Sequence, residues 1–454
     1  MTSVADPASA FINAACVPLD AAHVSWTLDE ADAILAAHPS VATHDIHTAA
    51  VLGDDDAVRR LLALDPASAT AKGGPRGWDA LTHLCFSRYL RLDAARSDGF
   101  VRAAEALLHA GASANTGWFE AEHQPEPVWE SALYGAAGVA HHAELVRLLL
   151  RHGANPNDDE VPYHAPESYD NAVVRALLES GRLTDESLVM MLIRKVDWHD
   201  AEGIRLLLAA GADPGAGTRW GVNTLHHAIR RDNAIDTVRL MLDHGADPTL
   251  VSQADGASAV ALAARYGRGD VLALFRERGI AAELSGADRL IAACARGDAL
   301  AARALADAEP QLLAQVVAHG GRLLARFAGT GNADGVRLLL DLGVPVTAVF
   351  AEGDGYFDIA PRSTALHVAA WRARPEVVQL LIDRGAPVNP LDGAGRTPLM
   401  LAVRACVDSY WTERRSPESV QALLAAGAST EGVAYPSGYA EVDALLATHG
   451  REGG

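Results

Sequence analysis

The side chains of this sequence that could perform acid–base chemistry are carboxylates in two neighbouring stretches. Glu130 ends a segment rich in aromatic and acidic residues, and Glu167 and Asp170 belong to a segment that begins V-P-Y-H-A-P-E. Carboxylates in a partly apolar cleft can have raised pKa values and exchange protons near neutrality. One hypothesis is therefore a small-molecule pocket, or an enzyme site, that uses Glu130, Glu167, Asp170 and the cationic Arg219. The sequence shows no nucleophile motif and no phosphate loop to accompany them.

Two acidic runs invite a metal-site interpretation. The run Asp197-Trp198-His199-Asp200 has three metal-ligating residue types in four positions, and Asp54, Asp55 and Asp56 are consecutive. Each run directly precedes a predicted helix, where carboxylates cap free N–H groups and complement the helix dipole. The sequence therefore predicts helix caps in both places, with no metal site and no cofactor.

Large aromatic residues suggest a second hypothesis, which is recognition of another molecule. They lie on or near predicted loops, outside the positions that a helical core requires, and exposed Trp and Tyr are characteristic binding anchors. The alternative is that these rings pack against their own loops as small satellite clusters. The predicted binding residues are Trp78, Trp118, Phe119, Trp129, Tyr163, Arg219, Trp220 and Tyr356.

A repeated helical unit must position these residues, and its clearest copy is the stretch from Ser363 to Asn389. Thr364 can cap a first helix, and Pro375 can open a second one at its first turn. The second helix has an apolar stripe, and Gly385 supplies the left-handed residue that ends it. The unit is thus a helix, a turn, a helix and an extended loop.

This unit resembles the ankyrin repeat, with its opening T-P-L-H-x-A-A and its closing L-L-x-x-G-A. Thr364, Leu366 and His367 match the opening, with Ala365 in place of Pro, and the pattern recurs as R-T-P-L-M-L, N-T-L-H-H-A and S-A-L-Y-G-A-A. Closing glycines at positions 211, 245 and 279 are 34 residues apart, near the period of ~33 for this repeat. The next step, from 279 to 343, is 64 residues and hides a degenerate unit around 294–308.

The resemblance implies an all-α solenoid of about eleven helix-turn-helix units with terminal caps. It also implies that His164, His226 and His367 are structural histidines that bond the backbone between units. Pro166 departs from the pattern and should shorten its helix.

The predicted domain organisation is a helical cap over residues 1–44, an array over 45–430, and a truncated repeat with a tail over 431–454. A capping box of Thr27 and Glu30 should open a helix in the first cap. Long loops over 73–79, 115–130, 218–221 and 347–362 are predicted to project as fingers beside the concave face, and 87–99 is predicted to lengthen a turn.

Composition narrows the classes of partner. The chain has 38 Lys and Arg against 58 Asp and Glu, a net charge of −20, which opposes nonspecific binding to nucleic acid or to a membrane surface. The four cysteines are far apart, which predicts reduced thiols in a cytoplasmic protein. The sequence thus favours a module that holds a protein or peptide of basic character, with small-molecule binding or catalysis as the alternative.

Overall fold

The computed structural model describes residues 6–19, 22–124, 126–280 and 283–452, which form two compact units, 1–218 and 219–454. Helices dominate both units, so the predicted all-α repeat solenoid is confirmed. In the part of the chain described, no helix has the length and apolar character needed to span a bilayer. The sequence-based boundaries at residues 44 and 430 remain predictions.

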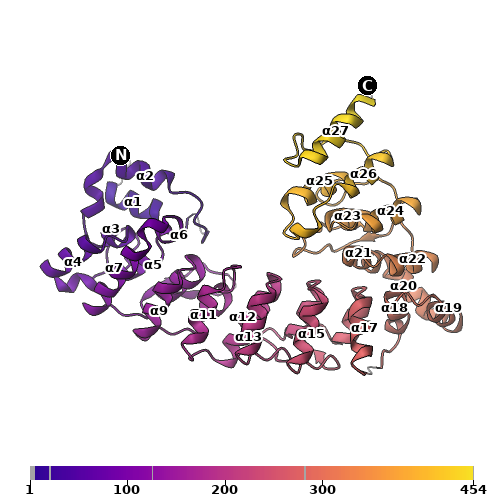
Figure 1. The fold of residues 1–454 in the computed structure, drawn as a ribbon, viewed down its shortest axis with the longest axis horizontal. Coiled ribbons are helices and arrows are strands. Elements are labelled where there is room, and N and C mark those ends of the chain that lie inside the picture. Colours follow the sequence, from indigo (N-terminus) through magenta and orange to yellow (C-terminus); the bar gives the residue numbers. More distant parts are fainter. Residues whose placement is uncertain (1–5, 20–21, 125, 281–282, 453–454) are drawn as a thin grey trace. The chain divides into compact units, whose positions relative to one another are not determined.

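The first unit stacks pairs of short helices in chain order (Figure 1). Its helices are α1 (Pro7–Ala15), α2 (Asp29–Ala37), α3 (Ile46–Val51), α4 (Asp55–Leu64), α5 (Ala80–Cys85), α6 (Arg88–Leu92), α7 (Ser97–His109), α8 (Ala132–Tyr134), α9 (Ala143–Arg151), α10 (Glu160–His164), α11 (Ala172–Glu179), α12 (Asp185–Asp197) and α13 (Ala201–Ala209). One row of contacts runs along α3, α5, α8, α10 and α12, and a second along α4, α7, α9 and α11. Strands β1 (Gly117–Glu120) and β2 (Val128–Ser131) form an antiparallel hairpin between two repeats.

The second unit repeats this arrangement. Its helices are α14 (Thr224–Arg230), α15 (Ile235–Asp243), α16 (Ala259–Arg265), α17 (Gly269–Glu277), α18 (Ala287–Ala295), α19 (Ala299–Ala308), α20 (Pro310–Ala318), α21 (Gly320–Thr330), α22 (Ala333–Asp341), α23 (Ala365–Trp371), α24 (Pro375–Asp383), α25 (Pro398–Asp408), α26 (Glu418–Ala425) and α27 (Ala440–Glu452). Two short hairpins join β3 (Val251–Ser252) to β4 (Ala257–Ser258) and β5 (Val349–Phe350) to β6 (Ser363–Thr364).

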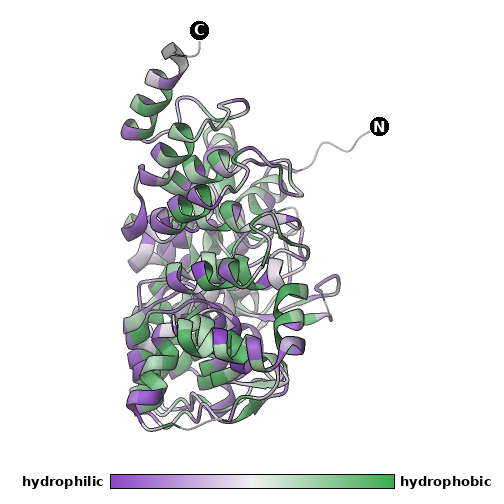
Figure 2. Ribbon diagram, turned by 90° about the vertical axis from the view of Figure 1, so that its right-hand side faces the viewer, coloured by the Kyte–Doolittle hydropathy of each residue, from purple (hydrophilic) through white to green (hydrophobic). Residues whose placement is uncertain are grey.

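Apolar stripes explain the stacking. Individual helices have a hydrophobic side and a hydrophilic side (Figure 2), and the buried residues are chiefly Ala, Leu and Val. Small alanines let neighbouring helices approach closely, while the leucines fill the space between pairs. Burial of this apolar surface, repeat against repeat, is the main source of stability.

Several local predictions are confirmed. Asp54 caps α4 by accepting a hydrogen bond from the Ala57 N–H at 2.9 Å, and Asp200 caps α13. Thr364 caps α23, and Pro375 is the first residue of α24. The degenerate unit predicted between Gly279 and Gly343 is present as helices α18 and α19.

Other local predictions are wrong. Helix α2 begins at Asp29 with Leu28 at the cap and no capping side chain, so Thr27 lies outside it. Acidic residues in its first turn complement the dipole instead. The segment 87–99 is more than a lengthened turn, because it contains α6. The interval between Gly279 and Gly343 also contains the additional helix α20, which the repeat period did not predict.

Candidate functional site

The β1–β2 hairpin sorts its residues between two faces, because successive strand residues point to opposite sides. Trp118 pairs with Glu130 across the strands, and Phe119 pairs with Trp129. Glu130 is 0% exposed and Trp118 is half-buried, whereas Phe119 is 59% exposed and Trp129 is 44% exposed. The hairpin therefore turns one carboxylate inward and presents two aromatic rings outward.

The inward face meets His23, on the segment between α1 and α2. Arg76 Nη2 holds the start of this segment through the Pro18 carbonyl at 2.9 Å, and Arg88 Nε holds its end through the Ser25 carbonyl at 2.6 Å. His23 Nδ1 then lies 2.8 Å from Tyr134 Oη, and His23 Nε2 lies 3.5 Å from Glu120 Oε2. The hydrogen bond with Tyr134 thus orients the imidazole so that Nε2 faces Glu120.

Glu130 completes this group. Ligand atoms of His23, Glu120 and Glu130 all lie within 4.8 Å of one another. Burial, with Glu160 and Glu120 nearby, raises the pKa of Glu130 to about 9, and burial lowers the pKa of His23. Two carboxylates and an imidazole so close together can share a proton or hold a cation. The sequence gave no signal for His23, because it lies about 100 residues before the segment that carries both carboxylates.

His164 lies next to this group, with its ring centroid 5.3 Å from that of Tyr134. Its Nδ1 lies 2.9 Å from Glu167 Oε2, and its Nε2 lies 3.2 Å from Glu160 Oε2. Burial lowers the pKa of His164, but hydrogen bonds to the two carboxylates outweigh burial and raise it to about 9. The predicted structural role, in which this ring bonds main chain between repeats, is therefore wrong for His164.

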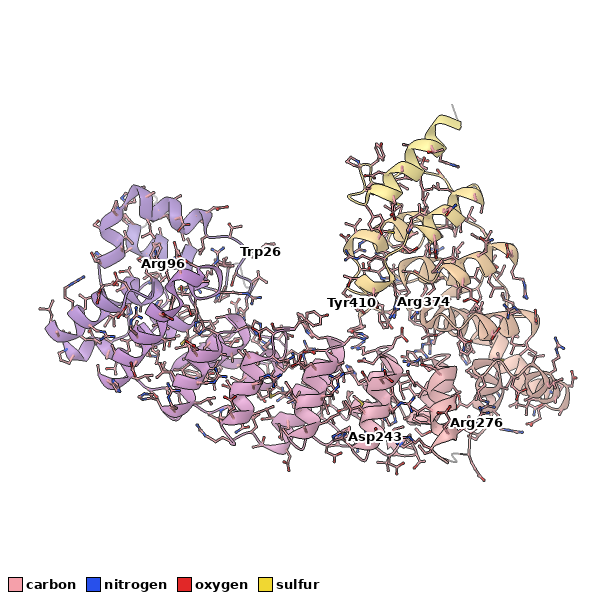
Figure 3. All side chains as sticks on the ribbon, viewed as in Figure 1. Trp26, Arg96, Asp243, Arg276, Arg374 and Tyr410 are labelled. Carbon is pink, nitrogen blue, oxygen red and sulfur yellow. The ribbon has the colours of Figure 1, made fainter. Side chains whose placement is uncertain are left out.

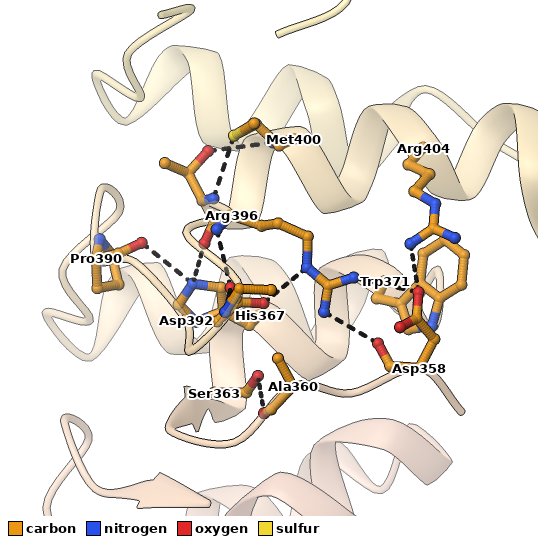
Figure 4. Close-up of polar contacts among 12 residues, drawn as sticks. Asp358, Ala360, Ser363, His367, Trp371, Pro390, Asp392, Arg396, Met400 and Arg404 are labelled. Carbon is orange, nitrogen blue, oxygen red and sulfur yellow. Dashed lines mark hydrogen bonds and ion pairs between the residues drawn. The ribbon is translucent and has the colours of Figure 1, made fainter. Parts of the chain in front are cut away.

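His226 and His367 do have that structural role. His226 Nε2 lies 3.1 Å from the Ala257 carbonyl, and His367 Nε2 lies 3.1 Å from the carbonyls of Pro390 and Arg396 (Figure 4). Both rings occupy the third position of their helices, whereas His164 is the last residue of the short α10. The displaced helix start, together with Pro166, therefore gives His164 other neighbours.

Glu167 is engaged by cations as well. Besides His164, it pairs with Arg194, which also donates to Asp197 Oδ2 at 2.7 Å and stacks 4.2 Å from the Tyr163 ring centroid. Burial opposes ionisation of Glu167, but His164 and Arg194 outweigh it and lower its pKa. Glu167 is therefore an ionised partner of two cations.

The remaining predicted catalytic residues are Asp170 and Arg219. Asp170 is exposed, lies just before the start of α11, and accepts a hydrogen bond from the Ala172 N–H at 2.9 Å. Arg219 belongs to the second unit, where its guanidinium lies 4.8 Å from the ring centroid of the exposed Trp220.

Not every predicted aromatic anchor is exposed. Trp78 is only 6% exposed, because its glycine-rich loop folds back through a Gly73–Trp78 bridge and its ring stacks 5.1 Å from that of Trp118. The expectation that Trp78 projects outward is wrong. Tyr356 is half-buried, with the Arg231 guanidinium 3.6 Å from its ring centroid, and it packs against an apolar cluster that includes Phe357. Trp78 and Tyr356 therefore fit the alternative interpretation, in which aromatic rings pack as small satellite clusters.

Comparisons with known families agree with the helix pairs. A family model for ankyrin repeats (3 copies) matches residues 190–285 and 351–431, and a model for a single ankyrin repeat matches 130–160. No curated protein sequence matches this chain. Among solved structures, the chain is similar to the human ASB11 ankyrin repeat domain, with 23% identity, a TM-score of 0.24, and coverage of 52% of this chain and 98% of that one. The stacked helix pairs, the structural histidines and the matching family models together show that the chain is an ankyrin-repeat protein.

Proposed function

We propose that this protein is a recognition module that holds a partner protein or peptide on an aromatic-rich, acidic concave face, with the β1–β2 hairpin as its anchor. Ankyrin repeats are in general protein–protein interaction modules. The observation that carries the proposal is the outward pair Phe119 and Trp129, two large rings directly opposite each other and both exposed to solvent. Exposed aromatic pairs of this kind are typical interaction hot spots.

Rigid support makes this pair a better anchor than rings on a mobile loop. Beneath it, Trp118 stacks on the buried Trp78 and lies edge-on to Phe86, with ring centroids 6.1 Å apart. A supported hairpin loses little conformational freedom when it binds, so more of the contact energy contributes to affinity. Phe119 and Trp129 can then act as one preorganised surface.

The negative charge of this surface favours a partner with basic residues. Glu122 and Glu126 are exposed at the tip of the hairpin, and the whole chain has a net charge of −20. Such a surface accelerates association with cationic segments and repels nucleic acid and anionic lipid. The partner proposed is therefore a protein segment that offers Lys or Arg beside an apolar side chain. A cytoplasmic setting is proposed as well, since the four cysteines are buried free thiols.

The acid–base alternative gains no support from the carboxylates predicted for it. Glu167 is paired with Arg194 and His164, and Asp170 is exposed and accepts a hydrogen bond from the Ala172 N–H. Glu130 has a raised pKa, but it is fully buried.

The test compares wild type with the double variant Phe119→Ser and Trp129→Ser. Proteins captured by wild type are identified, purified, and measured by calorimetry against wild type and the double variant. The dissociation constant is expected to rise roughly 30-fold or more, as removal of a hot spot of at least about 2 kcal/mol implies. Leu300→Ser, at an exposed leucine of α19, is the matched control and should bind as wild type does. Equal binding by the double variant and wild type would refute the proposal.

A further inference from the structure

We infer that His23, Glu120 and Glu130 form a binding site for one divalent first-row transition-metal ion, with Zn²⁺ as the best fit. Their ligand atoms lie within 4.8 Å of one another, close enough to share one ion. One imidazole nitrogen and two carboxylates are a donor set that Zn²⁺ and its neighbours accept. The inference concerns the inward face of the hairpin and does not depend on the function proposed for the outward face.

The first argument is the excess of buried acceptor atoms. Both carboxylate oxygens of Glu130 and the Oε2 of Glu120 are buried, and no N–H or O–H donor among the residues that the structure describes reaches them. Glu130 and Glu120 instead face each other, close enough for one shared proton to join them. An unpartnered buried carboxylate costs several kcal/mol, so such groups are normally paired or coordinate a metal. The group therefore needs a cation or a proton at its centre.

The second argument is the orientation of His23. Its Nδ1 contacts Tyr134 Oη at 2.8 Å, so a proton on Nδ1 has an acceptor there. Nε2 then has a free lone pair, and it lies 3.5 Å from Glu120 Oε2, which is also an acceptor. Metal-bound histidines characteristically donate their second ring N–H to an acceptor of this kind. A metal ion would turn the contact between two acceptors into shared coordination.

The third argument is how firmly these ligands are held. On either side of His23, the Pro18 carbonyl accepts a hydrogen bond from Arg76 and the Ser25 carbonyl accepts one from Arg88. Pairing of β1 with β2 places Glu120 and Glu130 on adjacent strands. Ligands on supported backbone meet the small tolerance of transition-metal coordination better than ligands on mobile loops do. Three protein ligands also leave room for water in the coordination sphere.

The experiment titrates the full-length protein, stripped with EDTA, with ZnCl₂, CoCl₂ and MnCl₂ in a calorimeter, and records the visible absorption of the Co²⁺ form. We expect one ion per chain, with Zn²⁺ bound more tightly than Mn²⁺. Glu130→Gln should weaken binding at least about 100-fold, and Tyr134→Phe, which removes only the partner of His23, about 10- to 100-fold. His123→Ala is the matched control, since His123 lies at the tip of the same hairpin and contacts the Glu126 carbonyl.

Several outcomes would overturn the inference. Absence of stoichiometric binding of all three ions would show that a proton alone holds the group together. Wild-type affinity in Glu130→Gln would place the ion elsewhere, and so would a loss in His123→Ala equal to that in Glu130→Gln. Circular dichroism of each variant verifies the fold, and His23→Gln, expected to lose binding as Glu130→Gln does, replaces that variant if it fails to fold.

Discussion

Arg372 Nη2 donates a hydrogen bond to Asp232 Oδ2 at 2.8 Å, although the two residues lie 140 positions apart in the sequence. Arg374, labelled in Figure 3, donates to the same oxygen at 2.8 Å, and Arg268 and Arg414 lie 3.4 and 3.8 Å from the carboxylate. The Asp232 side chain is only 9% exposed. One carboxylate therefore joins distant repeats within the second unit.

Asp232→Ala is expected to destabilise the protein by about 3–5 kcal/mol, because it leaves buried guanidinium groups without their counter-charge. Urea unfolding followed by circular dichroism measures the change. Asp236→Ala is the matched control, because Asp236 is almost fully exposed and its ion pair with Arg239 is long, at 3.9 Å. Such an exposed pair contributes little stability, so this variant should unfold at the wild-type midpoint. If both variants unfold at the same urea concentration, Asp232 does not have this stabilising role.

Lys195 and Asp200 form a buried ion pair in the first unit. Lys195 has a side chain that is 0% exposed, and its Nζ donates to Asp200 Oδ2 at 2.8 Å. Lys195→Ala should lower the free energy of unfolding by about 3 kcal/mol or more, because it leaves Asp200 buried without its cation. The double variant Lys195→Met with Asp200→Asn should lower this free energy by less, because neither charge remains. Denaturant titration of the single and the double variant compares their free energies of unfolding. A double variant less stable than Lys195→Ala would contradict it.

His164 should make stability dependent on pH. Its pKa rises from 6.5 to about 9 on folding, because its bonds to Glu160 and Glu167 outweigh burial. Its contribution is therefore complete below pH 6.5, declines as the pH rises, and is lost above about pH 9. In EDTA-containing buffer, the difference in melting temperature between wild type and His164→Asn should be large at pH 6 and small at pH 9.5. A difference that stays constant over this range would disprove the assignment.

The cysteines should be unreactive in the folded protein. Cys16, Cys85, Cys294 and Cys406 are all buried and free, and burial raises the thiol pKa values of Cys16 and Cys294 to about 12. Only the thiolate is nucleophilic, so a disulfide reagent such as DTNB should label the native protein slowly and label four thiols after unfolding. Rapid labelling before unfolding would show that one of these thiols is accessible.

Features that depend on neighbours within one repeat could be predicted from the sequence. Asp54, Thr364 and Pro375 open helices where expected, because caps and first-turn prolines act on the next few backbone groups. His226 and His367 also have their predicted role, since the same local turn presents each ring to the following loop. Recurrence of this local chemistry was enough to determine the repeat fold.

Contacts between segments far apart in the chain were decided only by the tertiary structure. The group of His23, Glu120 and Glu130 requires the N-terminal segment to lie against a hairpin about 100 residues later, and no spacing rule encodes that distance. The burial of Trp78 and the carboxylate partners of His164 likewise follow from how loops fold over the stacked helices. Local sequence thus determined the repeats, while packing between segments selected which polar side chains meet, because it sets their separation and their access to water.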